Sequence, residues 1–565
     1  MRRFGLLSYV GPLLGLVLIA AGLFLNFRFT GEGADDGQTF TEQAKMADRF
    51  VDSVGLSTHL GSNLWNGTFD TIYMPRVKEL GLRHIREDFG NHGQYLDALK
   101  KISDAGIKLD MIIARDAESQ THLPTINEAL VEINTYLGMG IKLGSVEGPN
   151  EYNHPRLYWD NQPPPAEWPR WLFEFTRDFA NSFRSDSRYQ GIEIFSPTYI
   201  NYGAGDLLKQ QGPFADYVDY GNYHWYCNDY WSDNNPADLS NFCNYDQHYQ
   251  AFAAPLYSGK TIIITENGIP STDNVAGAPV EVQRILLSED VAAKYTSRRL
   301  LELFNRGIKR TYLYQLYVAP DIPNNTLTYY MTLLKTDGAA KQPFTALKNL
   351  IALANDPGPQ FTPATLTYRL AAPTTLKRVL MQKRDGQFLL FLWQEVDSTK
   401  SVTPVSATIS FDNELMDVRS YNTVASTEPT YSGSGIGELA VGVGDSPVML
   451  AFSPTPSSPG NDGSGAGSGS SGTNSNSSGN SATNQGSNKS SGTSSKQGNA
   501  AQPEPATVSD ATNDPVVLPK NDPTSSPSNL EKVKGIGISL VIVGVLVLVS
   551  YAGSFMRASL WHGPV

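Results

Sequence analysis

The sequence has little cysteine and little charge. Only 2 of its 565 residues are cysteine, which excludes a small disulfide-stapled domain and a four-cysteine zinc or iron–sulfur site. Charged residues make up 18%, and 44 Lys and Arg against 56 Asp and Glu give a net charge of −12. Nucleic-acid binding needs clustered basic charge, so that class is disfavoured. HExxH, Walker, EF-hand and redox CxxC motifs are also missing, so we expect no metal or organic cofactor.

Long hydrophobic runs occur only near the two ends of the chain. Residues 6–27 form an apolar run behind two arginines, long enough to span the hydrocarbon core of a bilayer. The apolar part of a signal peptide is usually only about 7–15 residues long. We therefore favour a transmembrane anchor within residues 1–30, with a cleaved signal as the alternative. In both cases the segment that follows is exported.

A second uncharged apolar run predicts a transmembrane helix over residues 535–555. Before it, residues 456–530 are rich in Ser, Gly, Asn, Thr and Pro. Such a composition buries too little apolar surface to fold, and it predicts a flexible tether. The expected location is thus the cell membrane, with the globular part on its extracytoplasmic side.

Between residues 45 and 355, short apolar runs alternate with amphipathic stretches. This pattern predicts an α/β fold of parallel strands joined by helices, and eight repeats suit a (β/α)8 TIM barrel. One long helix is expected over residues 281–307, before the last strand. The eight expected strands are residues 53–59, 82–87, 108–114, 143–148, 193–198, 220–226, 260–266 and 310–317.

The pattern changes after the barrel. Over residues 360–455 apolar and polar residues alternate with period two, and RDGQ at 384–387 is typical of a hairpin turn. This stretch predicts a small antiparallel β-sandwich domain.

Carboxylates stand at the ends of two expected barrel strands. Asn150 and Glu151 follow the fourth strand, and Glu266 ends the seventh. In TIM barrels the chemistry lies at this edge, so the two glutamates should face each other across the barrel mouth. Glycoside hydrolysis needs such a pair, one carboxyl group protonated and the other ionised. Glu147 precedes the turn and is expected inside the barrel.

The Asn-Glu pair after strand four, together with a glutamate after strand seven, resembles clan A of the retaining glycoside hydrolases. These (β/α)8-barrel enzymes include cellulases, β-xylosidases and β-glucuronidases. The resemblance implies that Glu151 is the acid/base and Glu266 is the nucleophile. It also implies that Asn150 contacts the 2-hydroxyl group of the sugar.

Further positions match the same clan. Arg86 ends the second strand, where the clan commonly has an arginine that keeps the nucleophile ionised. The sixth strand carries His224 and Tyr226, and both residue types recur there in the clan. His59 ends the first strand, at a common sugar-contacting position. Each of these side chains has an alternative structural reading, as an ion-pair partner or a packed core residue.

Aromatic residues near the strand ends are candidates for sugar stacking. Many clan members have a tryptophan at the end of strand eight, whereas this chain has YLYQLY, with Tyr317 as the candidate contact. Trp225 and the neighbouring loop tryptophans could form subsite floors, or could simply pack. The substrate platform is where this chain departs from the clan.

The two cysteines flank the loop after the sixth strand. In an oxidising compartment Cys227 and Cys243 are expected to form a disulfide, which would close a loop of about 15 residues and contribute roughly 3 kcal/mol. Two unpaired buried thiols are the alternative.

The prediction from sequence is a retaining glycosidase acting on a cell-wall or extracellular polysaccharide through a glycosyl-enzyme intermediate. Its partners would be the polysaccharide or oligosaccharide substrate and the membrane. The two carboxyl groups should lie roughly 5–5.5 Å apart. A non-catalytic carbohydrate-binding adhesion protein and a transglycosylase remain as alternatives, and the sequence does not distinguish the sugar.

Overall fold

The computed structural model describes residues 37–61, 67–90, 93–226, 245–318 and 322–454. Both apolar runs, the predicted tether and the predicted Cys227–Cys243 disulfide lie outside these ranges. Within them, no helix combines the length and the apolar character needed to cross a membrane.

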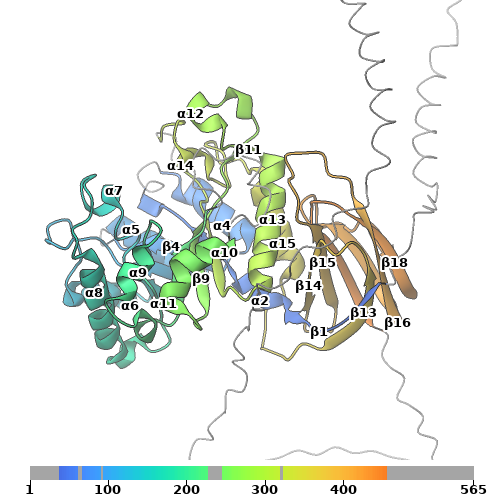
Figure 1. Ribbon diagram of the computed structural model, residues 1–565, viewed down its shortest axis with the longest axis horizontal. Helices are drawn as coiled ribbons and strands as arrows, with labels where there is room; N and C mark the ends of the chain where they lie inside the picture. The colour runs from blue at the N-terminus through green and yellow to red at the C-terminus, as the bar shows by residue number, and fades with distance from the viewer. Residues whose placement is uncertain (1–36, 62–66, 91–92, 227–244, 319–321, 455–565) are drawn as a thin grey trace, which may run out of the picture. The chain divides into compact units, whose positions relative to one another are not determined.

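Eight parallel strands form a nearly closed barrel (Figure 1), and each corresponds to one of the expected strands. The strands follow the order β7-β6-β5-β4-β3-β12-β9-β8. A parallel bridge between Phe195 and Tyr220 connects the two ends of this order. The bounds are β3 Val54–Ser57, β4 His84–Asp88, β5 Lys108–Ile112, β6 Leu143–Glu147, β7 Glu193–Phe195, β8 Gly221–His224, β9 Ile262–Asn267 and β12 Arg310–Tyr314.

Helices pack around the barrel, most of them through one buried face, whereas the helix Glu289–Asn305 is buried along nearly its whole surface. In the helix Ile126–Gly138, Thr125 accepts from the Glu128 amide while Glu128 accepts from the Thr125 amide, a reciprocal cap that fixes the start. The helix bounds are α2 Ala47–Asp52, α4 Met74–Leu80, α5 Gly93–Asp104, α6 Ile126–Gly138, α7 Pro155–Tyr158, α8 Trp168–Arg184, α9 Ala204–Lys209, α10 Tyr245–His248, α11 Ala254–Tyr257, α12 Val280–Gln283, α13 Glu289–Asn305, α14 Leu327–Tyr330 and α15 Gln342–Ala354.

The prediction of a single helix over residues 281–307 is wrong. The chain instead forms α12, the short strand β11 (Leu287–Ser288) and then α13. Leu287 pairs with Ser271 of β10 (Ser271–Thr272), and the extended Ser288 caps α13 by accepting from the Val291 amide. A serine that caps the first turn ends the extended segment and begins the helix.

A second sheet forms the β-sandwich-like part of the fold. Its strands follow the order β1-β13-β16-β19-β15-β14-β2, with β17 and β18 paired to β16. Their side chains enclose a separate core that includes Tyr368, Leu390 and Phe452. The bounds are β1 Gln38–Gln43, β2 Lys45–Met46, β13 Thr365–Ala371, β14 Leu376–Gln382, β15 Phe388–Gln394, β16 Val405–Asn422, β17 Tyr431–Gly433, β18 Ile436–Val443 and β19 Val448–Pro454.

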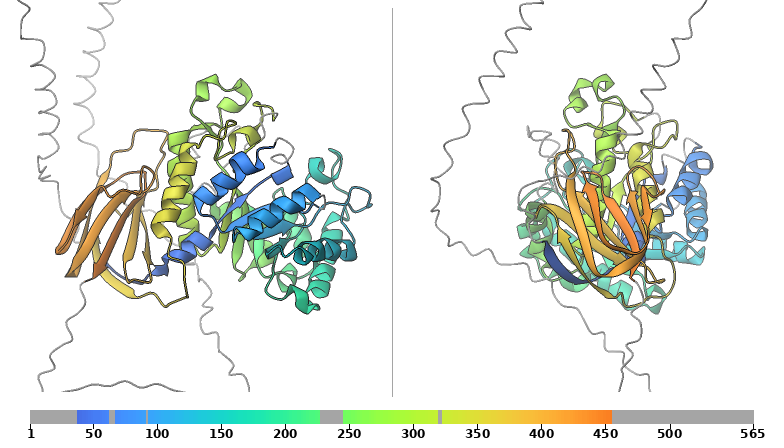
Figure 2. Two further views of the ribbon diagram at one scale, coloured as in Figure 1. Left: turned by 180° about the vertical axis from the view of Figure 1, so that it is seen from behind. Right: turned by 90° about the vertical axis from the view of Figure 1, so that its right-hand side faces the viewer.

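Two strands of this sheet, β1 and β2, precede the barrel in the sequence and lie outside residues 360–455, where the β-sandwich was expected. β1 pairs antiparallel with β13, and β2 pairs with β14; β1 is the dark blue strand at the edge of the orange sheet in Figure 2. Phe40 packs on the ring of Tyr368 across this pairing. The expected RDGQ hairpin joins β14 to β15, where Gly386 takes the positive φ of 89° that the turn requires.

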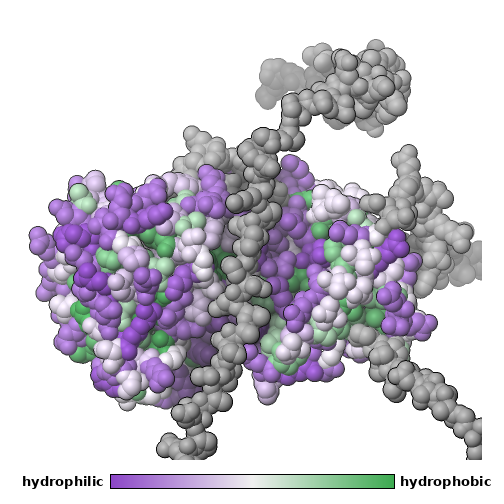
Figure 3. Space-filling view, turned by 60° about the horizontal axis from the view of Figure 1, so that its bottom comes forward, coloured by the Kyte–Doolittle hydropathy of each residue, from purple (hydrophilic) through white to green (hydrophobic). Residues whose placement is uncertain are grey.

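The exposed face drawn in Figure 3 is largely hydrophilic, and the hydrophobic residues on it occur in small scattered groups. Scattered apolar residues are normal on a water-exposed surface, and only a broad apolar patch would indicate a partner. This face therefore gives no sign of an apolar docking surface.

Besides its own separate core, the second sheet contributes side chains to the core of the barrel. Phe391, Trp393 and Met449 of the sheet belong to the same buried cluster as the barrel residues. Arg298 of α13 is buried and donates to the backbone oxygens of Gln394 (2.8 Å) and Val396 (3.0 Å). A guanidinium that satisfies two buried carbonyls ties α13 to the end of β15.

We expect Arg298→Leu to lower the free energy of unfolding by about 2–4 kcal/mol, because two carbonyls at the seam lose their charged donor. Chemical denaturation would measure the loss. Arg170→Leu is the matched control: Arg170 is exposed on α8 and pairs with Glu174, so its loss should cost no more than about 0.5 kcal/mol. Equal losses for both variants would contradict this account of the seam.

Candidate active site

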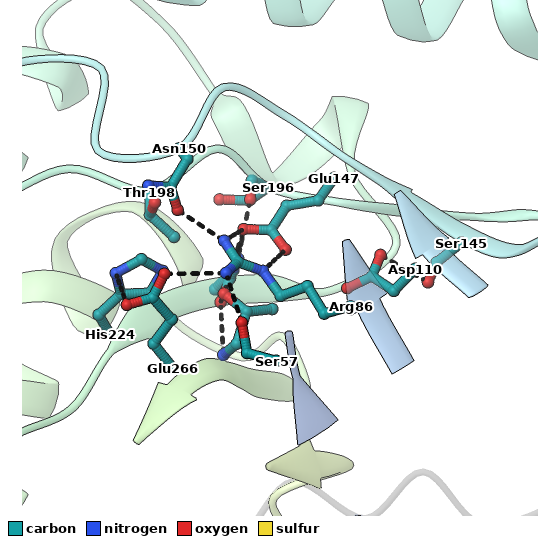
Figure 4. A network of polar contacts seen from close by, with 12 residues as sticks. Ser57, Arg86, Asp110, Ser145, Glu147, Asn150, Ser196, Thr198, His224 and Glu266 are labelled. Carbon is teal, nitrogen blue, oxygen red and sulfur yellow. Dashed lines mark hydrogen bonds and ion pairs between the residues drawn. The ribbon is translucent and has the colours of Figure 1, made fainter. Parts of the chain in front are cut away.

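Polar side chains converge at the C-terminal ends of the barrel strands. Arg86 comes from β4, Glu147 from β6, His224 from β8 and Glu266 from β9, and Figure 4 shows them pointing toward one another. Parallel pairing sets His224 directly opposite Glu266. Because all strands of a barrel end at one rim, residues far apart in sequence meet there.

Arg86 is the centre of this network. Its Nε and Nη2 donate to the two carboxylate oxygens of Glu147 at 2.7 and 2.8 Å. Its Nη1 donates to Glu266 Oε1 (2.8 Å), and its Nη2 also reaches Asn150 Oδ1 (2.6 Å). The guanidinium is 2% exposed. A buried guanidinium with this many acceptors orients every group around it.

Glu147 is a fully buried carboxylate, and its hydrogen-bond partners are buried as well. Besides Arg86, it accepts from Asn222 Nδ2 and from Thr265 Oγ1, both at 3.1 Å. Four donated hydrogen bonds compensate the loss of water around this charge. The carboxylate is therefore a fixed counter-charge for Arg86, and it does not face the barrel mouth.

Glu266 has the opposite placement, at the rim and partly open to solvent. It accepts from Arg86, and Tyr226 donates its hydroxyl to Oε2 (2.7 Å). Burial alone would raise the pKa of this carboxyl group. The neighbouring His224 and Arg86 charges and the two hydrogen bonds outweigh burial and lower the pKa to about 2. Glu266 is therefore a carboxylate throughout the physiological pH range.

Glu151 lies across from Glu266, on the loop after β6. Its Oε1 is 2.8 Å from His224 Nδ1, and the same nitrogen lies 3.5 Å from Glu266 Oε2. One oxygen of Glu151 and one of Glu266 lie within 4.8 Å of each other. His224 thus stands between the two carboxyl groups that the sequence singles out.

His224 takes its electrostatic character from both glutamates. Burial would lower the pKa of the imidazole, but Glu266 and Glu151 raise it above its ordinary value. The contact with Glu151 requires one proton between Nδ1 and Oε1, carried by the imidazole or by the carboxyl group. A proton held at this position is available beside Glu151.

His59 reaches the site through Tyr314, the last residue of β12. His59 Nε2 lies 2.9 Å from the Tyr314 hydroxyl, and the Tyr314 ring lies edge-on to Tyr226. Tyr314 therefore stands at the end of the eighth barrel strand, where the sequence resemblance leads one to look for a tryptophan.

Two predicted site residues point elsewhere. Trp225 is fully buried behind β8, with the guanidinium of Arg299 over its ring and Tyr245 against its edge. Tyr317 is also buried, and its hydroxyl donates to the backbone oxygen of Thr336 (2.8 Å). Neither side chain joins the group around Arg86, because each belongs to a packed layer outside the barrel mouth.

The sequence reasoning missed several polar residues that support the site. Asn222 and Thr265 hold Glu147, and Ser57 Oγ lies 3.2 Å from Arg86 Nη1. A signal was available, because each is a polar residue inside a strand that is buried over most of its length. Buried polar residues in such positions usually satisfy another polar group.

Among the described residues, one group offers metal-ligand atoms close together, namely Glu151, His224 and Glu266. Imidazole and carboxylate ligands would suit a transition metal. The hydrogen bond between His224 and Glu151 and the ion-pair contact between His224 and Glu266 already account for their proximity, and the Arg86 guanidinium beside Glu266 opposes a cation. The donor set therefore does not by itself call for a metal.

Comparisons with protein-family models and with curated proteins give no match. Among solved structures, the chain is similar to a glucosidase from Croceicoccus marinus, with 10% identity, a TM-score of 0.48, and 74% of this chain and 99% of that chain covered. A monomeric beta-xylosidase from Caulobacter crescentus CB15 is also similar, with 14% identity, a TM-score of 0.45, and 73% and 98% covered.

A family 39 glycoside hydrolase from Bacteroides cellulosilyticus WH2 is similar in the same way, with 13% identity, a TM-score of 0.43, and 72% of this chain and 82% of that chain covered. The resemblance to barrel glycoside hydrolases that the sequence predicts is thus also found among solved structures. Identities and TM-scores this low do not establish which reaction this chain catalyses.

We expect Glu147→Gln to lower the free energy of unfolding by about 2–4 kcal/mol, because it leaves the buried Arg86 with one counter-charge fewer. Denaturant titration would measure the change. Glu174→Gln, in the exposed pair on α8, removes the same charge at the surface and should cost at most about 0.5 kcal/mol. A Glu147 variant as stable as this control would show that Arg86 does not depend on Glu147.

The low pKa of Glu266 gives stability a dependence on acid. Below its ordinary pKa of 4.5 the unfolded chain binds a proton at this residue, whereas the folded protein does so only near pH 2. The contribution is complete above about pH 4.5 and is lost as the pH falls toward 2. Glu266→Gln should therefore lose stability less steeply than wild type between pH 5 and pH 3. Parallel losses in urea titrations would contradict the assigned pKa.

Proposed function

We propose that this chain is a retaining glycoside hydrolase acting on a cell-wall or extracellular polysaccharide. The observation that carries the proposal is the spacing of Glu151 and Glu266, with an oxygen of each within 4.8 Å. Retaining enzymes hold their carboxyl groups about 5–5.5 Å apart, whereas inverting enzymes need about 6.5–9.5 Å to admit a water. The spacing supports direct attack by one of the two carboxylates.

Glu266 is the nucleophile in this proposal. Its low pKa keeps it ionised, and its contacts with Arg86 and Tyr226 fix its orientation toward the mouth of the barrel. It attacks the anomeric carbon and forms a glycosyl ester. The fixed guanidinium and hydroxyl remain as hydrogen-bond donors around the ester oxygens, so little reorganisation is needed at the moment of reaction.

Glu151 is the acid/base. Its protonated carboxyl group donates to the departing glycosidic oxygen, and the resulting carboxylate then takes a proton from the water that hydrolyses the ester. His224 Nδ1 lies against this carboxyl group throughout, so a hydrogen bond stabilises each protonation state in turn.

Asn150 and His59 are proposed to contact the sugar. The side-chain oxygen of Asn150 is occupied by Arg86, which leaves its amide nitrogen as the group to donate to the 2-hydroxyl of the sugar. His59 is held by Tyr314 at the first strand end. These placements support a small set of polar contacts around a single sugar ring.

The cell-surface setting is part of the proposal and rests on the sequence alone. Its support is the pair of apolar runs at residues 6–27 and 535–551 and the polar tract between the second sheet and the second run. A chain of about 75 residues of that composition would have a root-mean-square reach of roughly 45–50 Å. Such a reach would suit work on a polymer close to the membrane.

The test is to incubate the full chain with plant, fungal and bacterial-wall polysaccharides and with aryl glycosides, and to identify the products. We expect Glu266→Gln and Glu151→Gln to lower kcat/KM on a polysaccharide by at least about 10²–10⁴-fold. Glu174→Gln, on the surface of α8, should leave it unchanged. Proton NMR should show that the product released first has the same anomeric configuration as the cleaved bond of the substrate.

Three outcomes would contradict parts of this proposal. Polysaccharide binding without release by wild type would favour an adhesion protein. Products longer than the substrate would favour a transglycosylase with the same two glutamates. A first product of inverted configuration would remove Glu266 as nucleophile, even if activity depended on it.

A further inference from the structure

The backbone of Glu151 has an unusual conformation. Its φ is +47°, in the left-handed region that side chains with a Cβ rarely adopt. Such a conformation persists only where the surroundings hold it in place, and it is often found at functional sites.

Thr198, on the loop after β7, makes three contacts with the turn that contains Glu151. Its Oγ1 accepts from the Glu151 amide (2.8 Å), and its backbone oxygen accepts from the Tyr152 amide (3.1 Å). Its own amide donates to the backbone oxygen of Pro149 (3.2 Å). The residue is completely buried, and Figure 4 shows it beside Asn150. Three peptide groups of this turn are thus held by a single residue.

The two loops are joined on both sides of this contact. Before it, the Gly148 amide donates to Phe195 (3.1 Å), and a Cβ on Gly148 would lie only 2.7 Å from the Pro197 nitrogen. After it, Asn153 and the backbone of Ile200 exchange two hydrogen bonds of 2.6 and 2.7 Å. The loops after β6 and β7 therefore lie together as one ladder.

One hydrogen bond between the two loops has a different type of acceptor from the others. The Glu151 amide donates to a hydroxyl group, Thr198 Oγ1, whereas the other acceptors are backbone or side-chain carbonyl oxygens. The neighbouring backbone contacts would survive any substitution of Thr198 that keeps its shape. The hydroxyl bond would not, and its loss would leave the Glu151 amide without its acceptor at the place where the backbone is strained.

We propose that Thr198 is a positioning residue for the acid/base: its hydroxyl holds the Glu151 amide so that the carboxyl group faces His224 and Glu266. This inference rests on the proposed function. Without the hydroxyl, the left-handed turn relaxes and carries the Glu151 carboxyl group away from the departing oxygen. Glu266 stays in place, because its own contacts come from β4 and from Tyr226.

The first test compares Thr198→Val, which keeps the shape and removes the acceptor, with Thr198→Ser, which keeps the acceptor. The probes are phenyl and 2,4-dinitrophenyl β-glycosides of glucose, xylose and glucuronic acid. A phenyl leaving group needs a proton from Glu151, whereas 2,4-dinitrophenolate departs without one. Thr198→Val should lower kcat/KM for the phenyl glycoside by about 10–100-fold and for the dinitrophenyl glycoside by less than about threefold.

Thr198→Ser should restore most of the phenyl activity. Thr176→Val is the matched control, since Thr176 is a buried threonine on α8 whose hydroxyl donates to the backbone oxygen of Leu172 (2.7 Å). It should change neither substrate. Equal losses on both leaving groups, or a serine variant as poor as the valine variant, would overturn the positioning role.

The second test does not depend on activity. Hydrogen exchange at the Glu151 amide, followed by residue-resolved mass spectrometry or NMR, should be slow in wild type and Thr198→Ser and at least about tenfold faster in Thr198→Val. Unchanged exchange in the valine variant would overturn the proposal. If wild type cleaves none of the glycosides or polysaccharides, the proposed function fails, while exchange still decides whether Thr198 holds the turn.

Discussion

The site depends on a guanidinium that is buried and must be neutralised. Removing Arg86 from water is costly unless anions and hydrogen bonds surround it. The barrel provides two carboxylates for this, one completely buried and one partly exposed. Glu147 is enclosed and bound by four donated hydrogen bonds, so its place is fixed. Glu266 shares the same cation from the rim, where one side of it remains open. The placement of Asn150 and part of the orientation of Glu266 follow from this cation, which also acts with His224 and Tyr226 to lower the pKa of Glu266.

Much of this arrangement could be predicted because barrel strands carry strong local signals and end at a common rim. The positions of Glu151 and Glu266 followed from strand order alone. The direction of individual side chains was predicted less well. Successive strand residues alternate between the two faces of a strand. Because His224 and Tyr226 point into the barrel mouth, Trp225 between them points outward. Tyr317 lies three positions beyond Tyr314, the last residue of its strand, and its hydroxyl contacts Thr336 instead of the Arg86 group. The pairing of β11 with β10 and of β1 with β13 depends on contacts distant in sequence, which local patterns do not contain.

The two carboxyl groups are held by different parts of the fold, and the difference suits the roles proposed for them. Glu266 belongs to a strand of the barrel, and its oxygens are fixed by a buried cation and a tyrosine hydroxyl. Glu151 belongs to a loop, and its backbone is held in the left-handed region by the loop of the next strand. A strand fixes a nucleophile rigidly with no added strain. A loop residue has to be held by a neighbouring loop if its carboxyl group is to meet a leaving group that approaches from outside the barrel.

The charge balance of the site also suits a two-step reaction. With Glu266 ionised, Arg86 faces two anions, and the raised pKa of His224 reflects the excess negative charge. In the proposed reaction, formation of the glycosyl ester removes the charge of Glu266, yet Arg86 keeps Glu147 and is never left without a counter-charge. In the same step Glu151 gives up its proton and becomes the anion that His224 faces. The net negative charge thus shifts from Glu266 to Glu151, on the other side of His224. The second step therefore begins with Glu151 already in its basic form, and the net charge of the two glutamates is unchanged.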